Sequence, residues 1–107
     1  MRSRPLPQPT PGAYVVSFSD EARGAAFGVA QDLRGAGLSA ELDLAGRSPK
    51  GQLKQAGRSA AKFALLLGLD EFDAAHVRVK TMDGGGEEDL AAAGLAAHLA
   101  ARLAKEA

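Results

Sequence analysis

Apolar residues are distributed along the chain in patterns that predict four strands. Short, mainly apolar runs occupy residues 13–18 and 62–68, and the second run is typical of a central strand covered on both faces. Polar and apolar residues alternate over 38–42 and 76–81, as in strands with one buried face. The last segment carries both of its cations on the polar side.

Helical spacing of apolar residues fills the segments between and after these strands. Ser19 is the expected N-cap of a first helix that ends near Gly35. Ser48 is the expected N-cap of a second helix over 49–60, with a proline at its first position. A third helix is predicted to begin at the acidic residues 87–89 and to carry leucines at every fourth position.

The predicted order of elements is β-α-β-α-β-β-α. Helical crossovers join the first three strands, which implies that these strands are parallel. The fourth strand follows the third through a short turn and is expected to pair with it in the antiparallel sense. Residues 83–86 are expected to form a flexible turn into the last helix. The predicted fold is a three-layer α/β/α domain with a mixed sheet.

The chain length of 107 residues suits a single domain. Four of the five prolines lie between Pro5 and Pro11, where they favour an extended chain. We therefore expect residues 1–12 to be a proline-rich linker or tail and residues 13–107 to be one α/β domain. A linker at this position favours a domain that belongs to a larger protein.

Composition excludes several classes of protein. There is no cysteine, so a disulfide framework, a thiolate metal site and a cysteine nucleophile are excluded. No apolar run approaches the ~20 residues of a membrane span, and the first residues lack the apolar stretch of a signal peptide. A cytoplasmic protein without a membrane partner is expected.

The 13 basic and 13 acidic residues give a formal net charge of zero, but they are unevenly distributed. Between Asp43 and Asp70 the chain has no acidic residue and five basic ones. Three of the five, Lys50, Lys54 and Arg58, lie four residues apart and form one stripe on the second predicted helix. Because flexible cations beside a helix N-terminus suit phosphate groups, this segment predicts binding to RNA or another polyanion.

Signatures of catalysis are incomplete. Gly46 and Gly51 have the spacing of a phosphate-binding loop, but Gln52 and Leu53 follow where that loop needs lysine and a hydroxyl residue. The two histidines lack the partners of a metal site, and no serine has an evident base. We therefore expect no cofactor, no metal and no catalytic residue.

Two blocks of sequence resemble a known family. They are GRSPKGQLKQA at 46–56 and KFALLLGLDE at 62–71, preceded by the Tyr14-Val15-Val16 strand and followed by Val77-Arg78-Val79-Lys80. Together they resemble the C-terminal anticodon-binding domain of class II aminoacyl-tRNA synthetases, in the histidyl-tRNA synthetase version. The resemblance covers most of the chain, and its order of elements agrees with the predicted one.

This resemblance implies recognition of tRNA, most directly histidine tRNA. In this family the domain docks on the anticodon stem and loop, while a separate domain activates the amino acid. The resemblance implies a catalytic domain of the same synthetase as a second partner, in cis or in trans. Carried over to this chain, Arg47, Lys50 and Lys54 are expected to contact backbone phosphates.

Further positions follow from the same resemblance. Gln52 and Gln55 are candidates for hydrogen bonds to the edges of unstacked bases, and Arg58 and Lys80 would widen the contact surface. Nothing in the chain resembles the catalytic domain, so these residues alone are not expected to activate an amino acid.

The chain departs from the family pattern in two places. Gly51 stands where the family often has another lysine, and the segment after Lys80 is expected to lack the family's further strand. A second interpretation also stays open at this point, namely a free-standing accessory or regulatory subunit with this fold that binds a protein partner or RNA. An enzyme with a doubly wound fold is the least favoured interpretation.

Overall fold

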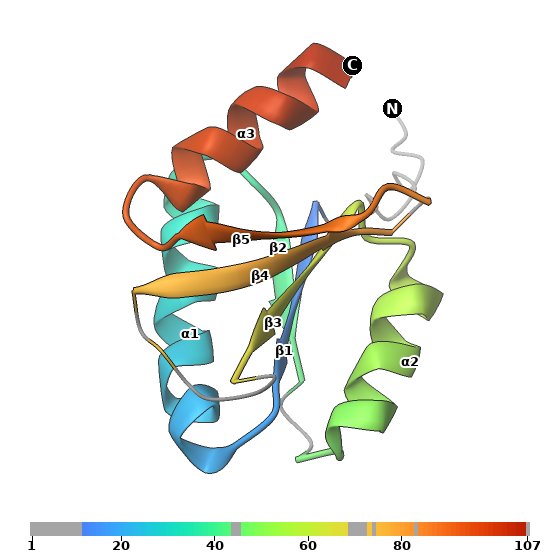
Figure 1. Ribbon diagram of the computed structural model, residues 1–107. Coiled ribbons are helices and arrows are strands. Elements are labelled where there is room, and N and C mark those ends of the chain that lie inside the picture. Colours follow the sequence, from blue (N-terminus) through green and yellow to red (C-terminus); the bar gives the residue numbers. More distant parts are fainter. Residues whose placement is uncertain (1–11, 44–45, 69–72, 74, 83, 107) are drawn as a thin grey trace, which may run out of the picture.

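The computed structural model describes residues 12–43, 46–68, 73, 75–82 and 84–106 (Figure 1). Its elements are β1 (Ala13–Ser17), α1 (Asp20–Gly35), β2 (Ala40–Leu42), α2 (Pro49–Ser59), β3 (Phe63–Leu67), β4 (His76–Thr81), β5 (Glu87–Ala91) and α3 (Leu95–Glu106). The proline-rich linker remains a prediction, because residues 1–11 lie outside the described residues. Gly12, the last residue assigned to it, is hydrogen-bonded to Ser39 and Phe63 at the start of the sheet.

All five strands form one mixed sheet in the order β2-β1-β3-β4-β5. Strand β1 lies between β2 and β3 and is parallel to both, as the two helical crossovers predict. Strand β4 is antiparallel to β3 and to β5. The buried strand β3 is therefore the central strand, where the parallel and antiparallel halves meet.

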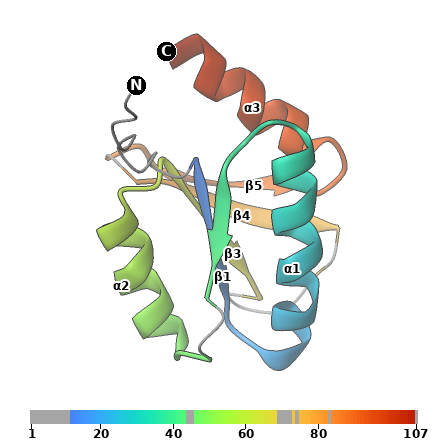
Figure 2. The same ribbon diagram turned by 180° about the vertical axis from the view of Figure 1, so that it is seen from behind.

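The helices cover the two faces of this sheet. Helices α1 and α3 lie on one face and α2 lies on the other (Figures 1 and 2). Residues from α1 and α3, including Leu33 and Leu99, pack with Leu65 and Val79 in the larger core. Side chains from α2 pack in a smaller core against the opposite face, around Val16. The three-layer α/β/α architecture is confirmed.

Capping hydrogen bonds fix both ends of α1, and the cap at its C-terminal end also fixes where β2 can start. The Ser19 hydroxyl accepts a hydrogen bond from the Ala22 amide at 3.1 Å, as predicted for the N-cap. At the other end the Leu38 amide donates to the Leu33 carbonyl at 3.0 Å, while Gly37 adopts a φ of +91°. This is a Schellman cap, which commits Leu38 to the helix end. Strand β2 therefore begins at Ala40 and is shorter than the alternation predicts.

The stretch after β4 differs from the expectation. Residues 87–91 form strand β5 instead of the first turn of a helix, and α3 starts only at Leu95. The Thr81 amide donates to the Gly86 carbonyl at 3.0 Å and joins the two sides of the hairpin. The order is thus β-α-β-α-β-β-β-α, and the expected absence of the family's further strand is wrong.

No helix in the described part of the chain is long and apolar enough to cross a membrane.

Candidate nucleic-acid interface

Helix α2 separates a buried side from a cationic side. Its N-terminus is capped by the Ser48 hydroxyl, which accepts a hydrogen bond from the Gly51 amide at 3.2 Å. Ala56 is fully buried against the sheet, while Lys50, Lys54 and Arg58 are exposed. At 1.5 Å per residue, these three cations follow about 12 Å of the outer helix surface. We call them the α2 stripe.

The α2 stripe is not paired with acidic side chains in the part of the chain that the structure describes, where none of its three cations has an ion-pair partner. The stripe therefore presents an uncompensated positive potential to solvent, as the acid-free segment of the sequence predicts.

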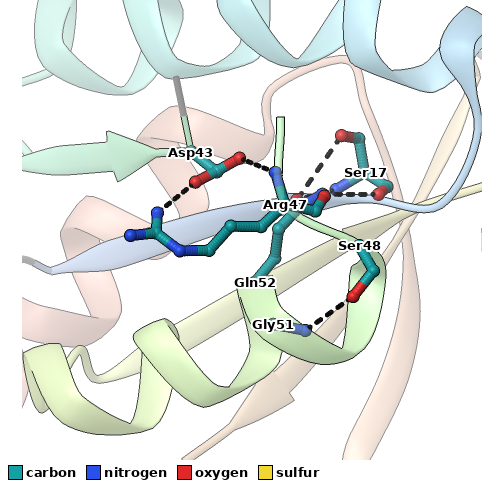
Figure 3. Close-up of polar contacts among 6 residues, drawn as sticks. All are labelled: Ser17, Asp43, Arg47, Ser48, Gly51 and Gln52. Carbon is teal, nitrogen blue, oxygen red and sulfur yellow. Dashed lines mark hydrogen bonds and ion pairs between the residues drawn. The ribbon is translucent and has the colours of Figure 1, made fainter. Parts of the chain in front are cut away.

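The resemblance predicts that Gln52 contacts a base edge, but its side chain does not lie at the surface. The residue is 2% exposed, and its side chain points into the junction between α2 and the end of β1 (Figure 3). Its amide oxygen accepts from the Ser17 amide at 2.9 Å, and its amide nitrogen donates to the carbonyls of Ser17 at 3.2 Å and Arg47 at 2.8 Å. Because the amide is buried and engaged, the structure corrects the expected contact between Gln52 and a base edge.

Arg47 lies just before α2 and is joined to Asp43, which follows β2 (Figure 3). The Arg47 amide donates to Asp43 Oδ2 at 2.7 Å, and its guanidinium donates to Asp43 Oδ1. The Asp43 side chain is 2% exposed, whereas the Arg47 side chain is 45% exposed. Arg47 is therefore at the expected surface, but Asp43 compensates part of its charge.

The charges of Asp43 and Arg47 both act on the pKa of Tyr14 in β1. The residue is 6% exposed in β1. Burial, and secondly the Asp43 carboxylate, raise the pKa of the phenol above its ordinary value of 10.0, and Glu41 adds to this while Arg47 opposes it. The phenol is neutral at physiological pH and belongs to the packing between β1 and α2.

Lys80 lies on the same face of the sheet as α2. Lys80 is paired in register with Ala64, which packs in the α2-side core, and directly opposed residues share a face. Its neighbour on that face, Arg78, donates to the Asp89 carboxylate at 3.0 and 3.3 Å. These bonds lower the pKa of Asp89. Lys80 is exposed on this face, and Gln55 is half-buried on α2.

The structure thus brings together most of the positions expected from the sequence. Arg47 and the α2 stripe share one side of the molecule, and Lys80 faces the same way from the sheet. The sequence reasoning missed Asp43 and Ser17, which hold the start of α2. The spacing of four residues between Asp43 and Arg47 is a signal that could have found the first of them.

Comparison with known proteins gives the family. The model of a family described as the anticodon binding domain matches residues 12–102. The chain therefore belongs to the family of anticodon-binding domains. A search of curated protein sequences gave no match.

Solved structures agree with this membership. Histidyl-tRNA synthetase from S. aureus is 30% identical with a TM-score of 0.76 over 86% of this chain, and the one from Nostoc sp. PCC 7120 is 29% identical with a TM-score of 0.77 over 94%. The RNA binding domain of threonyl-tRNA synthetase from Cryptosporidium parvum shares the fold at 18% identity and a TM-score of 0.74. The chain spans 24% of each of the two histidyl-tRNA synthetases. It corresponds to their non-catalytic anticodon-binding part.

Proposed function

We propose that this domain binds tRNA at the anticodon stem and loop, as the anticodon-binding domain of a histidyl-tRNA synthetase. The observation that carries the proposal is the α2 stripe, which combines exposure, no acidic partner among the described residues and a place in this fold. Likeness to two histidyl-tRNA synthetases supports histidine tRNA as the cognate molecule.

In this proposal the residues divide by the part of the RNA they meet. Arg47, Lys50 and Lys54 bind backbone phosphates, which sets the register of the domain on the RNA. Arg58 and Lys80 extend that charged surface, and Gln55 is the remaining candidate for a base edge.

The reaction itself belongs to a separate domain. The proposed partner is the catalytic domain of the same ATP-dependent histidine–tRNA ligase, in cis or in trans, and the proposed place of action is the cytoplasm. This domain contributes affinity and discrimination between tRNAs.

Equilibrium binding of the purified chain to a histidine tRNA transcript tests the proposal. Fluorescence anisotropy would be measured across a series of salt concentrations, with a second transcript in which only the anticodon bases are replaced. We expect binding that weakens steeply with salt, because cations replace phosphate counterions, and weaker binding to the changed anticodon. An absence of binding at low salt, or equal affinity for both transcripts, would contradict anticodon recognition.

A further inference from the structure

Asp43 is a buried carboxylate at the edge of the basic surface. It lies directly after β2, its side chain is 2% exposed, and it accepts hydrogen bonds from both the amide and the guanidinium of Arg47. An acid at this place is unexpected on a surface for RNA, because a carboxylate repels phosphate. Its burial beside the Arg47 guanidinium suggests a structural role in addition to its charge.

Arg47 is held by more than its bond to Asp43. Its carbonyl accepts from the buried Gln52 amide at 2.8 Å. Gly51, one turn along, leaves room for the arginine, because a Cβ there would lie 3.3 Å from Arg47 Cβ and 3.5 Å from Arg47 Cδ. Both the backbone and the side chain of Arg47 therefore have a fixed place before α2.

A fixed arginine offers an advantage that a mobile one lacks. A guanidinium carries five N–H donors, and the bond to Asp43 Oδ1 uses one nitrogen, while 45% of the side chain stays exposed. An arginine ordered before binding avoids the loss of rotamer freedom that a long side chain otherwise suffers on meeting a ligand. Arg47 also stands beside the N-terminus of α2, where backbone amides favour an anion.

We propose that Asp43 is a positioning residue for tRNA binding, which orders Arg47 so that its exposed guanidinium meets a phosphate at the start of α2. The inference rests on the proposed function and deepens it by assigning a favourable role to an acidic residue. The direction in which neutralisation of Asp43 changes RNA affinity therefore distinguishes positioning of Arg47 from a simple effect of charge. If Asp43 acted only through its charge, its neutralisation would raise RNA affinity. If it positions Arg47, neutralisation lowers affinity.

Asp43→Asn, Arg47→Gln and their combination test this in the full chain with the histidine tRNA transcript. We expect Asp43→Asn to lower affinity by roughly two- to tenfold, the scale of immobilising one long side chain. In the Arg47→Gln background the same change has no effect or raises affinity, because no arginine is left to position. A purely structural role for Asp43 would lower affinity in both backgrounds and would overturn the proposal. A rise in affinity in the wild-type background would overturn it too.

Arg47→Lys provides a second test that leaves the buried carboxylate in place. Lysine keeps the charge but lacks the planar set of donors, so we expect affinity to fall by about as much as in Asp43→Asn. Affinity equal to that of the wild type would overturn the proposal, whatever the stability of Asp43→Asn. These outcomes are separate from failure of the proposed function, in which the wild-type chain itself does not bind the transcript.

Discussion

One buried side-chain amide joins the end of β1 to the residue before α2, at the carboxyl edge of the parallel strands. Gln52 bonds the backbone of Ser17 at the end of β1 and that of Arg47 before α2. A buried polar group costs free energy unless its hydrogen bonds are made, and here both amide atoms are engaged. Gln52 therefore fixes where α2 begins relative to the sheet, and through α2 it fixes the position of the cations.

Removal of this amide should destabilise the domain. We expect Gln52→Ala to lower the free energy of unfolding by roughly 1–3 kcal/mol, because it leaves the buried Ser17 amide without its acceptor. Urea denaturation would measure the change. Gln55→Ala is the matched control, since Gln55 is half-buried on the same helix and should change stability by only about 0.5 kcal/mol. Equal effects of the two substitutions would show that the Gln52 bonds do not stabilise the fold.

Tyr14 allows the charge of Asp43 to be observed directly. It is the single tyrosine in a chain without tryptophan, so the ultraviolet absorbance of tyrosinate reports on it alone. We expect a titration midpoint above 10.0 in the folded chain, and a lower one in Asp43→Asn that still exceeds 10.0 because burial is the larger cause. A midpoint that does not respond to Asp43→Asn would contradict the electrostatic contact.

The same shift gives a stability prediction with a definite sign. Because the pKa of Tyr14 is raised in the folded state, its contribution is fully present below pH 10.0 and is lost as pH rises through the folded pKa. Tyr14→Phe should therefore lose less stability over that alkaline range than the wild type does. Urea denaturation at several alkaline pH values would measure this, and parallel losses in the two proteins would contradict it.

At the scale of elements, the start of α2 combines a structural cap with the proposed binding surface. Ser48 accepts from the Gly51 amide, so Ser48→Ala should cost about 1 kcal/mol of stability. Ser48→Asp keeps a capping oxygen and should stay within about 0.5 kcal/mol of the wild type. The aspartate adds a negative charge at the proposed surface, so Ser48→Asp should clearly weaken tRNA binding, whereas Ser48→Ala should not. If Ser48→Asp binds tRNA as the wild type does, phosphates do not approach this end of α2.

Strand β5 shows why one element escaped the sequence reasoning. Its residues are Glu87, Glu88, Asp89, Leu90 and Ala91, of which all but Leu90 are exposed, so no apolar periodicity marks a strand. Acids before an alanine-rich stretch are typical of a helix start, and local propensity favoured that interpretation. Pairing with β4, including the bond from Arg78 to Asp89, stabilises the strand instead. Charged side chains on an edge strand also discourage pairing with other chains.

The other elements were predictable because they bury regular apolar patterns or carry clear caps. In the candidate site, too, the positions fixed by local helix geometry were predictable, and the one that depends on a distant contact was not. The spacing of Lys50, Lys54 and Arg58 gives the exposed stripe directly, since helix geometry fixes it. The burial of Gln52 depends on the end of β1, which is 35 positions away in the sequence. No local pattern reveals such a contact, although Gln52 shares a helix side with the buried Ala56.

At the scale of the whole molecule, the net charge of zero is divided between different regions. The α2 helix presents the cationic stripe, while acidic residues lie on β5 and in the first turn of α1. Glu87 and Asp89 of β5 oppose Lys80 and Arg78 in register, so they share the α2 face of the sheet and compensate cations there. This division sets the orientation in which a polyanion can approach. Any RNA that binds the domain should therefore meet the α2 side, and loss of charge on the opposite face should matter little beyond the Debye length of about 10 Å at 0.1 M salt.

The central claim is that tRNA binds through the α2 stripe, and Lys50→Ala with Lys54→Ala tests it most directly. A matched control, Gln31→Glu with Ala101→Glu, changes the net charge equally at exposed positions of α1 and α3 on the opposite face. We predict that the lysine variant binds histidine tRNA at least about tenfold more weakly. We also predict that its slope of log affinity against log salt is lower by roughly 1.4–1.8. The control should bind nearly as the wild type does. Equal losses in both variants, or an unchanged lysine variant, would contradict the account.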